Sequence, residues 1–185
     1  MRASLFALLF ASMTMLAVAP ASADSTAGMM AMMQAFAGVH SYHADITTPK
    51  GQTLSMDVVQ PDKVHMTMGG KMQMITIGGD TWMDMNGSWQ HLPMANPMAQ
   101  RPLDMAHHAG LSANGPRDYN ITDLGATMLG GVMTNKYHMV GKNGDTVDMW
   151  VAKNLPLQVQ ATGKDGTATI KYSEYNSVPD ITPPM

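Results

Sequence analysis

The chain has 185 residues, of which only 14% are charged, and a formal net charge of −3. It has no basic cluster, which argues against a nucleic-acid partner, and no cysteine, which excludes disulfides and a lipid-modified cysteine. Methionine, with 22 residues, is far more frequent than the filling of gaps in a core requires.

Residues 1–23 are typical of a secretory signal peptide. Arg2 precedes an apolar run over residues 5–18, and Ala21, Ser22 and Ala23 form a small-x-small cleavage pattern. The run is shorter than the roughly 18 to 20 apolar residues of a membrane span. We therefore expect cleavage after Ala23 and export, without an anchor, to the periplasm of a Gram-negative bacterium.

The expected mature chain, residues 24–185, is long enough for one domain. Removing 23 of the 185 residues leaves 162, a length that buries about two thirds of the unfolded surface. Only Met1, Met13 and Met15 are removed, so 19 of the 22 methionines remain. We expect a single monomeric domain in which methionine has a defined role.

An amphipathic helix is predicted directly after the cleavage site. Ser25 or Thr26 can cap its beginning, and Gly38 can end it. Apolar side chains recur at positions i, i+3, i+4 and i+7: Met29, Met32, Met33 and Phe36. We expect this stripe to pack on a sheet.

Residues 55–93 predict an antiparallel meander, and residues 41–60 predict the hairpin with which it begins. Runs rich in Val, Ile, Met, Thr and Trp alternate with turn signals such as Gly69-Gly70 and Asn86-Gly87. We expect strands at residues 41–48, 52–60, 64–68 and 72–77, followed by two strands that carry Trp82 and Trp89. Methionines two residues apart share one face of a strand.

The register of the hairpin over residues 64–77 decides where its methionines lie. A three-residue turn that includes Lys71 pairs Met68 with Met72 and Met66 with Met74, so that all four share one face. A two-residue turn puts Met66 and Met74 on opposite faces. We prefer the first register because it leaves the polar residues of the hairpin in solvent, although it exposes two isoleucines: Ile75 and Ile77.

Prolines break the pattern between residues 93 and 116. At most one short helix fits there, over residues 102–109. We interpret the segment as a helical or loop lid over the sheet, with disorder as the alternative.

Strands resume after this segment and complete a mainly β, α+β fold. We expect strands at residues 118–124, 136–140, 146–152, 157–162 and 167–175, the later ones joined at Asn143-Gly144 and Asp165-Gly166. Nine to eleven strands in one small domain form a sheet that curves strongly.

Signatures of catalysis are absent, so we expect no enzymatic activity. The sequence has no G-x-S-x-G, H-E-x-x-H or phosphate-loop motif, and Ser112 near His107 and His108 in a proline-rich segment is no evidence for a triad. No cofactor is expected. A methionine-rich face has three open interpretations: core filling, an adaptable surface for apolar ligands, or a thioether site for monovalent copper.

Five phrases along the mature chain resemble, in order, the periplasmic lipoprotein-carrier superfamily typified by LolA and LppX. They are PDKVHM at 61–66, the segment 78–89, DLG to HMVG at 123–141, MWVAKNLPLQVQ at 149–160 and TIKYSEYNSVPDITPP at 169–184. The resemblance implies a curved antiparallel sheet that forms an incomplete β-barrel, whose apolar inner face holds acyl chains. It also implies membrane-bound donor or acceptor proteins as partners.

The function expected from the residues and the resemblance together is a non-enzymatic periplasmic carrier or binding protein for lipoprotein acyl chains, lipids or other apolar ligands. The predicted lining of its cavity is Met56, Val58, Val64, Met66, Met68, Met72, Met74, Trp82, Trp89, Met149, Met33 and Phe36. The alternative is a periplasmic copper-binding protein that uses His65, Met66, Met68, Met72 and Met74.

Overall fold

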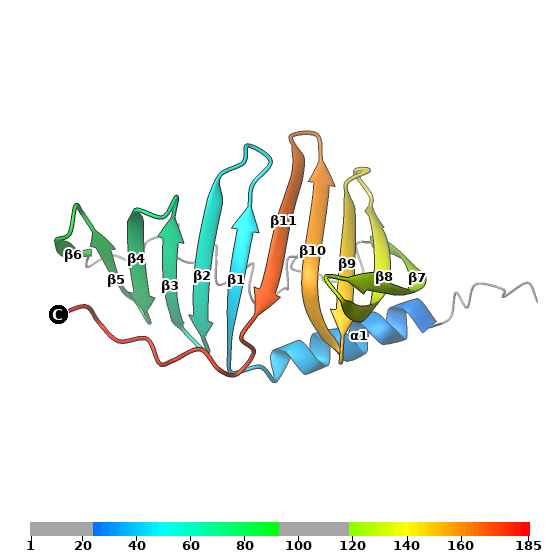
Figure 1. Cartoon of the computed structure of the whole chain (residues 1–185), viewed down its shortest axis with the longest axis horizontal. Coiled ribbons are helices and arrows are strands. Elements are labelled where there is room, and N and C mark those ends of the chain that lie inside the picture. Colours follow the sequence, from blue (N-terminus) through cyan, green and yellow to red (C-terminus); the bar gives the residue numbers. More distant parts are fainter. Residues whose placement is uncertain (1–23, 93–118) are drawn as a thin grey trace, which may run out of the picture.

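The structure is a computed structural model and describes residues 24–92 and 119–185. This part of the chain forms one helix and eleven strands (Figure 1). Their bounds are α1 (Asp24–Ala37), β1 (Ser41–Thr47), β2 (Thr53–Val59), β3 (Lys63–Met68), β4 (Met72–Ile77), β5 (Asp80–Asp84), β6 (Trp89–Leu92), β7 (Tyr119–Leu129), β8 (Val132–Gly141), β9 (Thr146–Ala152), β10 (Leu155–Gly163) and β11 (Gly166–Ser173).

All eleven strands belong to a single sheet in the order β6-β5-β4-β3-β2-β1-β11-β10-β9-β8-β7, and each pairs antiparallel with its neighbours. The last strand, β11, returns to pair with β1 at the centre. The outermost strands, β6 and β7, do not pair with each other. The sheet is therefore open, which confirms the predicted curved, incomplete barrel. The predicted lid, with its helix over residues 102–109, lies outside the described residues.

The predicted register of the β3–β4 hairpin is confirmed. Met66 is directly opposite Met74, and Met68 is opposite Met72, with the Lys71 amide donating to the Met68 carbonyl at 3.2 Å. The expected exposure of Ile75 is wrong, since this side chain is only 8% exposed. Ile75 and Ile181 of the C-terminal tail line the same pocket, so the tail shields it.

Strands β7 and β8 are longer than predicted. The first is predicted to end at residue 124 and the second to begin at 136. In the structure β7 extends to Leu129 and β8 begins at Val132, with the turn at Gly130-Gly131. Gly125, at a φ of 78°, lies in a β-bulge opposite β8, where its amide donates to the Asp123 carboxylate. A glycine bulge bends a strand without ending it, which explains the error.

Helix α1 packs on one face of the sheet, against β10 and β7. A Cβ at Gly28 would lie 2.3 Å from the Tyr137 hydroxyl, so glycine permits the close approach of helix and sheet. Ser25 does not cap the helix, which begins at Asp24. Instead its hydroxyl donates to the Ile121 carbonyl of β7 at 3.2 Å.

We call the helix-bearing side of the sheet the inner face and the other side the outer face. Cross-strand pairing places Tyr137, Met149, Val159 and Ile170 in one row of the inner face. The helix adds Phe36, whose ring lies 5.2 Å from that of Tyr42. Among the described residues, no helix is long and apolar enough to cross a membrane.

Candidate functional site

Methionine dominates the inner face over strands β2 to β5. Met56, Met66, Met74 and Met83 lie directly opposite one another on four successive strands and form a continuous row. The neighbouring row contains Met68 and Met72, also directly opposite each other. We call these six residues the methionine face.

Exposure varies across the methionine face. Met56, Met66 and Met74 are buried, at 4% to 5% exposed, whereas Met68 and Met83 are intermediate. Met72 is 43% exposed. The face is therefore buried at Met56, Met66 and Met74 and reaches solvent at Met72, near the β3–β4 turn.

The other predicted lining residues of the inner face fall into two groups. Val58 and Val64 are opposite each other in the row next to Met56 and Met66, and both are buried. Met149 is on β9, in the half of the sheet on which α1 packs, and α1 supplies Met33 and Phe36. The fold thus places these residues on one face but at two ends of it.

Trp82 and Trp89 lie on the outer face, opposite to the side on which the prediction placed them. Trp82 pairs with Ile75 and stacks on the His91 ring at 5.0 Å, and Trp89 pairs with Asp84. Because successive residues of a strand point to opposite faces, Met83 takes the inward position beside Trp82. Met83 is not among the predicted lining residues, although it is one of the methionines that stand two residues apart in the sequence, here from Met85.

The hydroxyl of Tyr42 is a buried polar group without a hydrogen-bond partner in the described part of the chain. Tyr42 pairs with Val58, in the row that borders the methionine row. Burial raises the pKa of Tyr42 far above its usual range, so the hydroxyl keeps its proton. An unpaired buried donor costs about 1 to 3 kcal/mol, so an acceptor atom brought to it would be stabilised.

The outer face carries a cluster of charged residues centred on His43. Its Nδ1 lies 2.6 Å from Asp57 Oδ1, and its Nε2 lies 3.3 Å from Ser55 Oγ and 3.4 Å from Asp45 Oδ1. This arrangement is not among the sites predicted from the sequence. The signal was the β1–β2 hairpin, whose turn places residues 43 and 57 opposite each other.

The connection Asp57–His43–Ser55 is that of a catalytic triad, but its electrostatics differ. Partial burial lowers the pKa of His43, but the hydrogen bonds and charges of Asp57 and then Asp45 outweigh it and raise the pKa. The raised pKa means that a larger fraction of His43 carries a proton at a given pH, and a protonated imidazole cannot act as a general base toward Ser55. We therefore assign the cluster a structural, charge-pairing role.

This assignment predicts a pH-dependent contribution of His43 to stability. The folded state holds the His43 proton more tightly than the unfolded chain does. The stabilisation is fully present below about pH 6.5, the ordinary pKa of histidine, and is lost as the pH rises through the raised pKa. In urea unfolding over this range, His43→Asn should remove a contribution on the order of 1 kcal/mol at the acidic end.

The Asp57→Asn variant is the matched test of the cause. It should flatten the same part of the pH profile, because Asp57 supplies the 2.6 Å hydrogen bond to His43. Unfolding free energies that run parallel for wild type and both variants across the whole range would contradict the assignment.

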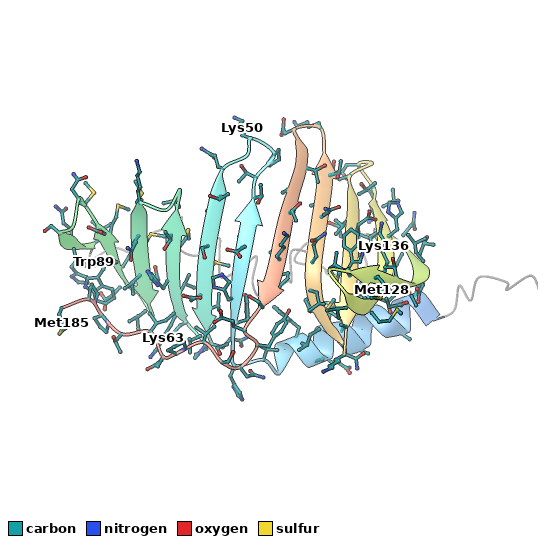
Figure 2. The ribbon with its side chains drawn as sticks, in the orientation of Figure 1. Lys50, Lys63, Trp89, Met128, Lys136 and Met185 are labelled. Atoms are coloured by element: carbon teal, nitrogen blue, oxygen red, sulfur yellow. The ribbon has the colours of Figure 1, made fainter. Side chains whose placement is uncertain are left out.

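The C-terminal tail closes a shallow pocket on the outer face next to this cluster. The pocket has a volume of about 260 Å³ and is lined by Asp57, His65, Ile75 and residues 178–182. Lys63 anchors the tail through a 2.6 Å ion pair with Asp180, a contact that lowers the pKa of Asp180. Figure 1 shows the tail passing the lower ends of the central strands toward β5, and Figure 2 places Lys63 there.

The alternative metal set divides between the two faces. His65 is on the outer face, where its Nε2 lies 3.1 Å from Gln73 Oε1, while Met66, Met68, Met72 and Met74 are on the inner face. Within residues 24–92 and 119–185, no three His, Cys, Asp or Glu side chains are grouped so as to hold a metal ion.

Comparison with known proteins identifies the fold. No protein-family model and no curated protein matches the chain. The structure of the lipoprotein LppX from Mycobacterium tuberculosis matches with a TM-score of 0.60 and 12% identity, over 84% of this chain and 97% of LppX. LprF from Mycobacterium bovis matches with a TM-score of 0.67 and 15% identity, over 90% and 99%.

MucB is a third structural match, with a TM-score of 0.53 and 12% identity, over 89% of this chain and 62% of MucB. These likenesses extend over most of the chain, although identity is low. The chain therefore has an LppX-like fold, which confirms the resemblance found in the sequence at the level of the fold.

Proposed function

We propose that this protein is a non-catalytic binding protein or carrier that holds lipids, lipoprotein acyl chains or similar apolar ligands on its methionine face. The observation that carries the proposal is the cross-strand register, which places six methionines on the inner side of an open sheet. Methionine is unbranched and has a polarizable thioether, so such a surface adapts to chains of different shape.

The energetics of this face suit an acyl chain. Each methylene group moved from water to an apolar surface contributes about 0.8 kcal/mol. Met72, at 43% exposed, leaves a point of entry at one end of the face, while Met56, Met66 and Met74 are buried. This contribution grows with the number of buried methylene groups and needs no specific contacts, so it suits ligands of varied chain length.

Tyr42 adds a polar group beside the apolar face. Its buried hydroxyl lacks a partner in the described residues, and residue 42 belongs to the row of the inner face next to the methionine row. A ligand with a carbonyl or ester oxygen near its apolar chain would accept this hydrogen bond. We therefore expect amphiphilic lipids to bind more tightly than plain hydrocarbons.

The proposal includes the cellular setting. The predicted signal peptide exports the chain to the periplasm, where a monomer of one domain, residues 24–185, exchanges cargo with membrane-bound donor or acceptor proteins. The LppX-like fold, with TM-scores of 0.60 and 0.67 to LppX and LprF, is consistent with such a role.

Native mass spectrometry of the mature protein, purified from the periplasm without delipidation, tests the proposal. We expect adducts of lipid mass that disappear after extraction with organic solvent and return when phospholipid is added back. A spectrum with only the bare chain, both before and after incubation with phospholipid vesicles, would contradict it.

A further inference from the structure

We propose that Met66, Met68, Met72 and Met74 form a binding site for monovalent copper. The four residues lie at the corners of a rectangle on the inner face, because Met66 is directly opposite Met74 and Met68 directly opposite Met72. Directly opposed Cβ atoms are about 4.5 to 5.5 Å apart, and residues i and i+2 of a strand about 7 Å. Four long, flexible side chains that start from such corners can bring their sulfur atoms together above its centre.

The donor atoms select the metal. A thioether is a soft, neutral ligand, suited to Cu(I), whereas Mg²⁺ and Ca²⁺ prefer oxygen, and imidazole suits Zn²⁺. The residues that alternate with the four methionines, His65, Thr67 and Gln73, belong to the outer face, and His65 and Gln73 are within hydrogen-bond distance of each other. We call Met66, Met68, Met72 and Met74 the quartet. The side chains that it presents on the inner face are therefore all thioethers.

The exposure of the quartet provides both entry and shielding. Met72 is 43% exposed, Met68 is intermediate, and Met66 and Met74 are each 5% exposed. An ion that first meets Met72 can pass to the buried pair and lose contact with water. Met83 and Met56 continue the row on either side of that pair and offer further sulfur ligands.

Thioether coordination has a distinctive pH dependence. Cysteine and histidine ligands must lose a proton before they bind a metal, so their affinity falls in acid. Methionine has no proton to lose. Copper affinity of the quartet should therefore be the same at about pH 5.5 and pH 7.5, a range in which histidine titrates.

Titration of the delipidated protein with Cu(I), under reducing conditions and in competition with a chromophoric Cu(I) chelator, tests the proposal. We expect one tightly bound Cu(I) per chain, with equal affinity at both pH values. Met68→Leu with Met72→Leu keeps the face apolar but removes two sulfur atoms. This variant should bind Cu(I) more weakly by roughly tenfold or more, a loss seen even for residues that only support a metal ligand.

Met128 and Met133 provide the matched control. They are also directly opposite each other on neighbouring strands, but they are 58% and 62% exposed, and Figure 2 shows Met128 at the β7–β8 end of the sheet. Met128→Leu with Met133→Leu should leave Cu(I) affinity unchanged. Equal weakening by both double variants, no uptake by the wild type, or weaker binding in acid would each overturn the copper site.

This inference is separate from lipid binding, although both use the methionine face. The two are read out separately: phospholipid adducts of the wild type appear in native mass spectra, and Cu(I) uptake appears in the chelator competition. Weaker Cu(I) binding by Met68→Leu with Met72→Leu, with Met128→Leu and Met133→Leu as the unchanged control, supports the copper site. Lipid binding without any copper uptake overturns it and leaves the proposed carrier function intact.

Discussion

Met66→Asp combined with Met74→Asp should abolish the uptake of an apolar ligand. The two positions are directly opposite each other in the centre of the methionine face, and each is 5% exposed. A ligand bound over them would desolvate two carboxylates, at a cost of several kcal/mol. Since 1.4 kcal/mol is a factor of ten, we expect affinity to fall by about 100-fold or more. Titration with a fluorescent fatty-acid probe measures the loss.

The controls separate the loss of the surface from the loss of the fold. Lys71→Ala changes an exposed residue at the β3–β4 turn and should bind the probe as the wild type does. Circular dichroism reports whether the double variant is folded. If it is not, Met72→Asp introduces one carboxylate at the solvent-exposed edge of the same face, where the fold tolerates it, and should also weaken binding. Probe affinity equal to wild type in the folded Asp variants would show that the ligand face is elsewhere.

The register of the methionine face is predictable because the information is local. Gly69 and Gly70 mark the turn, and the alternation of polar and apolar residues selects the pairing that gathers Met66 with Met74. The same alternation does not say whether Trp82 or Met83 faces inward, since both are apolar. The two-residue Gly78-Gly79 turn, which pairs Ile77 with Asp80, decides it.

Features that depend on contacts between distant segments of the chain cannot be predicted from the local sequence pattern. The tail residue Ile181 lines the same pocket as Ile75, which lies more than a hundred residues earlier in the chain. The pairing of β1 with β11 at the centre of the sheet is equally remote. The sequence pattern therefore gives the strands and much of each half of the sheet, but neither the join between the halves nor the burial of the outer face.

The second large expected effect is a loss of stability when an apolar residue of the C-terminal tail is truncated. Ile181→Ala should lower the free energy of unfolding by about 2 to 5 kcal/mol, the usual range for a buried isoleucine. Ile181 and Ile75 are both 8% exposed and line the same pocket, so the truncation leaves Ile75 facing water. For a chain of this length each kcal/mol shifts the melting temperature by roughly 2 to 4 °C, so thermal and urea unfolding both detect the change.

Two neighbouring substitutions distinguish apolar burial from the ion pair. Asp180→Asn removes the partner of Lys63 but changes an exposed carboxylate, and exposed ion pairs contribute little to stability because water and salt screen them. Thr182→Ala alters an exposed neighbour and should have little effect. If Ile181→Ala unfolds at the same urea concentration as Thr182→Ala, the tail does not stabilise the outer face.

Because the tail and the methionine face lie on opposite sides of the sheet, Ile181→Ala should destabilise the fold while the folded variant still binds ligand with unchanged affinity.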